Sequence, residues 1–104
     1  MNRHPVDVAL ERAAQDVLPH FTEDLRRHAN RAGWPASAVE DLSVAHSGGA
    51  FIPRHSRRET HDVEYGTRTT RPNPAMRTWA NGSHTKFLDE YDRSLGKHLS
   101  GVLV

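Results

Sequence analysis

The sequence contains no cysteine, which excludes disulfide bonds and thiolate metal ligands. It has no apolar run near the ~20 residues that a membrane-spanning helix needs, and its first residues lack the apolar block of a signal peptide. Aromatic residues make up only 7% and hydrophobic residues only 36% of its 104 residues. We therefore expect a single small domain, 1–104, that gains part of its stability from assembly.

A strong charge of either sign is also missing. The 14 Lys and Arg residues nearly balance the 13 Asp and Glu residues, leaving a formal charge of +1. Such a chain has no overall attraction to nucleic acid, so any affinity of that kind has to come from a local cluster.

Apolar residues recur at every third or fourth position near the start of the chain, at Val6, Leu10, Ala13, Val17, Phe21 and Leu25. This spacing predicts an amphipathic helix over 6–29. Pro5 suits its first turn, and Gly33 suits its end. Pro19 interrupts the pattern, and a proline inside a helix deletes one backbone hydrogen bond. We expect either one bent helix or two helices in series.

Alternating apolar residues predict the strands. Val39, Leu42 and Val44 alternate with polar neighbours, and the pair Gly48-Gly49 can form a tight turn, so 41–52 is a candidate hairpin. Pro53 is expected to limit pairing beyond Ile52. "RHSRRET", residues 54–60, is expected to be an exposed loop or strand extension. A further strand is expected to carry His61, Val63 and Tyr65 on one face and to stop at Gly66.

Two helices are expected after the strands. Asn73 suits a helix N-cap and Pro74 a first helical position, and the short helix that follows buries Met76, Trp79 and Ala80 and ends at Asn81-Gly82. A last helix is expected from about Thr85 to His98. Its apolar side carries Phe87, Leu88, Tyr91, Leu95 and Leu99, and Asp89 and Arg93 form an i,i+4 pair. The predicted class is α+β: a bent N-terminal helix, an antiparallel sheet of about three to four strands, and C-terminal helices packed on one face.

Two short motifs carry a resemblance to a known family. "VEYGT", 63–67, followed by "PNPAMR", 72–77, resembles the tail-completion proteins of long-tailed phages, which are also described as neck, head–tail joining or minor tail components. The matching residues are Val63, Glu64, Tyr65, Gly66, Thr67, Pro74, Met76 and Arg77. The sequence departs from the family at Ala75, where an aromatic residue is usual, and at Thr78-Trp79, where Pro-Ala is usual. The Thr-Gly-Leu-Arg signature that usually follows the first helix is not visible.

The resemblance implies a structural virion protein without catalytic residues, cofactor or metal. Such proteins form a ring, commonly six-fold, at the neck of the virion, and are assembled in the host cytoplasm. The ring joins the tail terminator or tail tube protein to the head-completion (stopper) protein. DNA passes through its channel without specific recognition, and no membrane is involved.

The arginines of "RHSRRET" allow two interpretations. Arg54, Arg57 and Arg58 could contact a phosphate backbone, or they could pair with carboxylates of a neighbouring subunit or partner. Of these two contacts the second is favoured, because Glu59 and Asp62 follow at once. A loop that is only solvated and mobile until assembly is an equally open expectation. The first leaves an alternative function open, a small nucleic-acid-binding or regulatory module that uses the Arg54–Arg58 loop.

The histidines and Glu64 raise the question of an enzyme. His46, His55 and His61 could bind Zn²⁺ in a small hydrolase, but no helical HxxxH or HExxH spacing is present. On the expected strand, Glu64 and His61 point to opposite faces and cannot act as a catalytic pair. Glu64 is therefore expected to face solvent or to pair with an arginine of a neighbouring subunit. No catalytic and no metal-binding residue is predicted.

Overall fold

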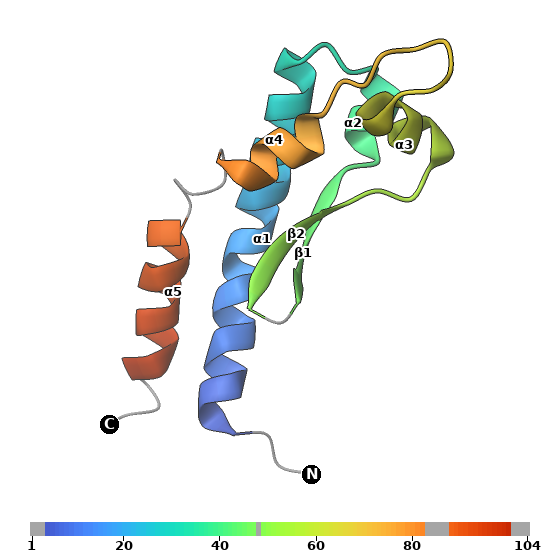
Figure 1. Cartoon of the computed structure of the whole chain (residues 1–104). Coiled ribbons are helices and arrows are strands. Elements are labelled where there is room, and N and C mark those ends of the chain that lie inside the picture. Colours follow the sequence, from blue (N-terminus) through green and yellow to red (C-terminus); the bar gives the residue numbers. More distant parts are fainter. Residues whose placement is uncertain (1–3, 48, 83–87, 101–104) are drawn as a thin grey trace.

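The structure is a computed structural model that describes residues 4–47, 49–82 and 88–100. Its elements are α1 (Pro5–Arg31), α2 (Ala36–Glu40), β1 (Ser43–Ser47), β2 (Ala50–Arg54), α3 (Arg58–Tyr65), α4 (Ala75–Asn81) and α5 (Leu88–Ser100) (Figure 1). The α+β class is as predicted. However, the described residues form a two-stranded antiparallel sheet, so the expectation of three to four strands is wrong.

Helix α1 is one unbroken helix of 27 residues, which resolves the choice between one helix and two. Pro5 stands in its first turn, as predicted. Pro19 has no N–H to donate to the carbonyl of Gln15, one helical turn earlier. Both residues are exposed, so water can hydrate that carbonyl and the helix continues past the proline. The helix ends at Arg31, and Gly33, which was expected to close it, follows the C-cap residue with a φ of 84°. There the amides of Gly33 and Trp34 bond back to the carbonyls of Asn30 and Ala29, the pattern of a Schellman cap.

The predicted hairpin is confirmed, but its pairing extends further than expected. Ser47 pairs with Ala50, and the register runs to Ser43 and Arg54. Val44 lies opposite Pro53, yet its amide donates to Thr22 Oγ1 of α1 over 3.0 Å instead of to β2. A pair that exchanges no hydrogen bonds needs no N–H from the proline. Pairing therefore passes Pro53, and the prediction that it stops near Ile52 is wrong.

The expected strand at 61–65 is a helix, α3, and this is the main correction to the predicted fold. Its buried residues, Thr60 and Glu64, are four positions apart and therefore lie on one helical face. Both are polar, so a search for apolar periodicity misses them and finds only the alternation of Val63 with its neighbours. Similarly, Val39 belongs to the short helix α2 and not to a strand.

The core lies along the C-terminal half of α1, where α2, α4 and the hairpin pack against it (Figure 1). Phe21 is its centre: its ring meets that of Phe51 edge-on, with centroids 4.5 Å apart, and that of Trp79 at 6.4 Å. The buried cluster consists of Val17, Phe21, Leu25, Ala29, Trp34, Ala38, Leu42, Val44, Ala75, Met76 and Trp79. The predicted core positions of α1 and α4 are thus largely confirmed, although Ala80 is only partly buried.

Helix α5 lies beside α1 and has no buried residue. It begins at Leu88 and ends at Ser100, and the expected residues 85–87, including Phe87, lie outside the described part of the chain. Tyr91 reaches the hairpin, where its ring centroid is 5.2 Å from that of Phe51. The expected Asp89–Arg93 ion pair is not formed among the described residues.

Candidate functional site: the joint between α3 and α4

The two motifs of the sequence meet in one place, which we call the joint (residues 63–77). Glu64, at the end of α3, is fully buried. Its Oε1 accepts the amide of Met76 over 2.7 Å, and its Oε2 accepts the amide of Arg77 over 3.1 Å. These amides belong to the first turn of α4, where no intrahelical acceptor is available and a negative charge is favoured. Glu64 therefore caps α4 from a different helix.

Arg77 completes the contact from the other side. Its Nε donates to Glu64 Oε2 over 2.9 Å, and its terminal nitrogen donates to the Glu64 carbonyl over 3.0 Å. The Arg77 side chain is half exposed, and its guanidinium lies 4.7 Å from the centre of the Tyr65 ring. Glu64 was expected to face solvent or another subunit; instead its partner is within the chain. Oε1 accepts one hydrogen bond and Oε2 two, and the carboxylate is shielded from water, so the contacts of this residue are structural ones within the chain.

Gly66 fixes the path between the two helices. It has a φ of 80°, and a Cβ built there would lie 2.8 Å from both the Pro72 nitrogen and the Thr70 carbonyl oxygen. These are backbone atoms, which cannot rotate away as a side chain could. The loop beyond is closed by the amide of Thr67, which donates to the Thr70 carbonyl over 2.9 Å, and by Thr67 Oγ1, which accepts from the Thr70 amide.

Asn73 does not cap α4 as predicted, and Pro74 stands at the N-cap position, one residue before the predicted first helical position. Helix α4 begins at Ala75, and no side chain of the preceding residue caps it. Asn73 instead ties the joint to the end of α1: its side-chain amide donates to the Ala32 carbonyl over 2.8 Å, and its own carbonyl accepts Trp34 Nε1 over 3.0 Å. The predicted N-cap is thus wrong, because the Glu64 carboxylate already holds the first amides of the helix.

A second carboxylate organises the start of α3. Asp41 accepts the amides of Ser56 and Arg57 and the hydroxyls of Ser56 and Thr60, the last over 2.6 Å. The hydrogen bond from Thr60, followed by that from the Arg57 amide, holds the pKa of Asp41 far below its usual range. Sequence reasoning missed this residue. The sequence signals the helix start itself through Ser56-x-x-Glu59, a pattern that commonly precedes a helix, but this pattern does not point to a carboxylate 15 residues earlier.

A third carboxylate connects α4 to α1. Asp24 is buried, and its Oδ2 accepts Trp79 Nε1 over 2.9 Å. Trp79 is fully buried, whereas Ala75 lies beside it with little volume of its own. The bulky side chain of this helix is thus the indole at position 79. The resembled family usually has Pro-Ala at positions 78 and 79 and carries its aromatic residue at position 75. Asp41, Glu64 and Asp24 together connect α2 to α3, α3 to α4, and α4 to α1.

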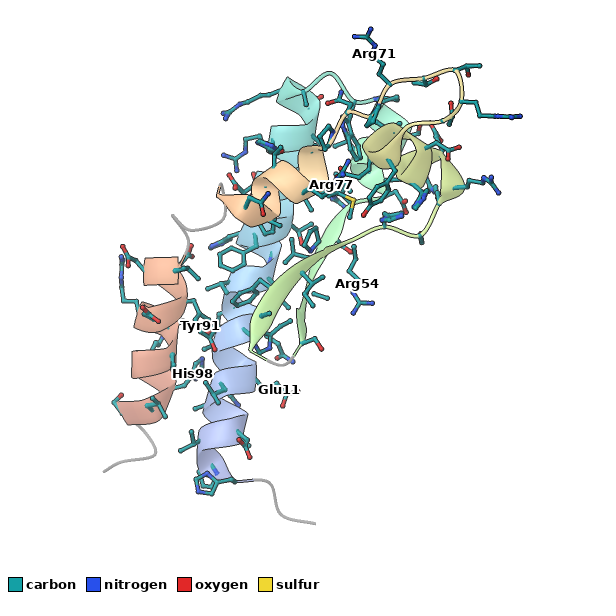
Figure 2. All side chains as sticks on the ribbon, viewed as in Figure 1. Glu11, Arg54, Arg71, Arg77, Tyr91 and His98 are labelled. Carbon is teal, nitrogen blue, oxygen red and sulfur yellow. The ribbon has the colours of Figure 1, made fainter. Side chains whose placement is uncertain are left out.

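The arginines of 54–60 do not form one loop. Arg54 ends β2, Arg57 precedes α3, and Arg58 is its first residue. Arg57 is turned back onto the molecule, because a terminal nitrogen donates to the Ser37 carbonyl over 3.2 Å. Arg54 points outward (Figure 2), and neither it nor Arg58 has a hydrogen bond or ion pair within the described part of the chain.

The three histidines considered for Zn²⁺ do not come together. The rings of His55 and His61 lie tilted to each other with centroids 5.5 Å apart, and that of His61 lies tilted to the Tyr65 ring at 4.6 Å. His46 instead lies against Phe51 and Tyr91. Among the described residues, no three His, Asp or Glu side chains are placed to bind one metal ion.

Comparisons of this chain with protein-family models, with curated proteins and with solved structures found no match. Within residues 4–47, 49–82 and 88–100, none of the helices combines the length and apolarity that crossing a membrane requires.

Proposed function

We propose that this chain is a structural virion protein of the tail-completion type, which forms a ring at the head–tail interface of a long-tailed phage. In this proposal its function is to assemble and not to catalyse a reaction. On one side the ring contacts the tail terminator or tail tube protein, and on the other the head-completion protein. DNA passes through its channel, and the protein resides in the neck of the virion.

The observation that supports this most is the convergence of the two motifs on which the resemblance rests. Glu64 and Arg77, one from each motif, bind each other and close the joint. Gly66 stands where the backbone leaves no room for a side chain. Each of these residues thereby has a structural reason to be present. Residues that interlock in this way define a rigid corner, which an assembly subunit needs in order to hold its contact surfaces at fixed angles.

The shape of the chain also favours assembly. Its radius of gyration is 16.2 Å, compared with about 13 Å for a compact chain of this length. It exposes 6933 Å², whereas a compact monomer of this mass exposes about 5,900 Å². The outer face of the hairpin leaves Ile52 exposed, and α5 leaves Leu88 exposed. Contacts with further copies or with partner rings would cover such surface.

The proposal can be tested by adding the purified chain to an extract of cells infected with a phage whose copy of this gene is disrupted. If the chain joins heads to tails, the number of infectious particles rises with its concentration. A matched extract that receives the chain unfolded by heat gives no rise. A disrupted phage that already yields a normal titre, or an extract that no amount of folded chain restores, would overturn the proposal.

A further inference from the structure

The loop between α3 and α4 is basic and carries no opposing charge. Residues 65–88 contain no Asp or Glu, whereas Arg68 and Arg71 lie in the loop itself. Both are exposed, and neither has a hydrogen bond or ion pair within the described residues. Figure 2 shows Arg71 pointing away from the body at the end of the molecule. These charges are therefore available to a partner.

The loop also has a defined shape. The two hydrogen bonds between Thr67 and Thr70 close it, and the tight approach of Gly66 to Pro72 fixes its base. A loop already held in one conformation loses less entropy on binding than a mobile one. The side chains of Thr67, Thr69 and Thr70 add hydroxyl groups beside the two arginines.

A third free arginine borders the same region. An open hollow of about 580 Å³ runs from His55 and Arg58 at the start of α3 to Gly66 at the base of the loop. Arg58 has no partner in the described part of the chain, whereas Arg57 is held by Ser37. Two carboxylates lie nearby: Asp62 in this lining, and Glu59, which lines a neighbouring hollow with Asp62, Thr67 and Thr70 and accepts from Ser37 Oγ. The arginines at positions 57, 58, 68 and 71 outnumber these two, so the exposed charge of this end is mainly positive.

We propose that Arg58, Arg68 and Arg71 form a surface that binds the phosphate backbone of nucleic acid without reading its sequence. Arginine, with hydroxyl groups and backbone amides nearby, is the combination that contacts phosphates in protein–DNA complexes. An acidic protein partner is less well matched, because such interfaces depend on a buried apolar or aromatic anchor. The exposed aromatic residue nearby, Tyr65, is already packed against His61 and Arg77. This surface goes beyond the head–tail role and does not depend on it.

The test measures binding of a fluorescent DNA duplex of about 20 base pairs by anisotropy, with a dissociation constant of roughly 1–100 µM expected near 150 mM salt. Three phosphate contacts predict that affinity falls about 40-fold when salt rises from ~50 to ~200 mM. In the double variant Arg68→Gln, Arg71→Gln one contact remains, and the fall shrinks to about 3-fold. Circular dichroism checks that this variant is folded.

A matched control removes the same two charges elsewhere. Arg12 and Arg93 are exposed on α1 and α5, away from the loop. The variant Arg12→Gln, Arg93→Gln should keep the full 40-fold salt dependence that three contacts predict. The proposal is overturned if this control loses as much affinity as the loop variant, or if the wild-type chain does not bind the duplex. It is also overturned if poly-glutamate of equal charge displaces the duplex as well as unlabelled DNA does, since the surface would then suit an acidic protein.

Discussion

The two ends of the molecule use similar polar groups with different consequences. Around the joint, Glu64 and Asp24 are buried carboxylates that accept hydrogen bonds from α4. At the other end, α5 is attached to α1 by exposed pairs: Asp16 accepts from Ser94 Oγ and bonds to His98, and His20 bonds to Glu90. Removing one partner of such a contact costs far more stability where water is excluded than where both groups remain exposed.

This difference indicates where the chain is rigid. The joint combines buried carboxylates with the apolar cluster around Phe21 and Trp79. Helix α5 has no buried residue, so little apolar burial supports its exposed pairs. The joint should open only when the whole domain unfolds, whereas α5 should separate from α1 at a lower free energy.

The largest effect is expected for Glu64→Gln. The new side-chain amide would present N–H groups to donors that need an acceptor, and it would leave the Arg77 charge without its partner. We expect a loss of about 3 kcal/mol in the free energy of unfolding, measured in urea at fixed protein concentration. The exposed residue Glu23, paired with Arg27 on the surface of α1, supplies the control. Glu23→Gln should change stability by less than about 0.5 kcal/mol, and equal losses in both variants would refute the special role of the joint.

A smaller loss is expected for Gly66→Ala. The substitution adds a Cβ at a positive φ and places it against the backbone of Pro72 and Thr70. We expect a loss of about 2–3 kcal/mol in the same assay. Gly49 has the same φ of 80° with open space around it, so Gly49→Ala measures the conformational cost alone, about 1 kcal/mol. If the two variants lose the same stability, the close contact of the new Cβ with Pro72 and Thr70 adds nothing to the cost of the positive φ.

The response of stability to acid should depend on Asp41. Its folded pKa lies below the value in the unfolded chain, so between the two the folded state binds fewer protons. This contribution to stability is complete above about pH 4 and is lost as the pH falls further. In Asp41→Asn, stability should be lower at neutral pH and should fall less steeply in acid. Thermal unfolding between about pH 2 and 7 measures both effects, with Asp7→Asn as an exposed control. If the stability of Asp41→Asn falls in acid as steeply as that of the wild type, Asp41 is not the source of this pH dependence.

The smallest global effect is expected for Asp16→Asn, which weakens the exposed contacts with Ser94 and His98. The melting temperature should barely change, while the amides of α5 exchange with solvent faster and those of α3 and α4 do not. Hydrogen exchange followed by mass spectrometry separates these responses. A large drop in melting temperature would show that α5 is as firmly integrated as the joint.

The sequence predicted helices and strands correctly where the buried residues are apolar, and it failed to do so where they are polar. The periodicity of α1 and the glycines of the hairpin predicted both elements, because leucine, valine and phenylalanine face the core there. Helix α3 was predicted as a strand because its inward residues are Thr60 and Glu64, which pattern reasoning assigns to the surface. The motif residues of the joint could be selected from their resemblance, but their contact could not, since Glu64 and Arg77 meet only when α3 and α4 fold together.

The most direct test of the central proposal, that this chain joins head to tail, is electron microscopy of a lysate from the phage that would encode it, with this gene disrupted. The account predicts full heads lying beside complete but unattached tails, with joined particles restored when the intact gene is supplied. Intact joined particles in the absence of the gene would contradict it.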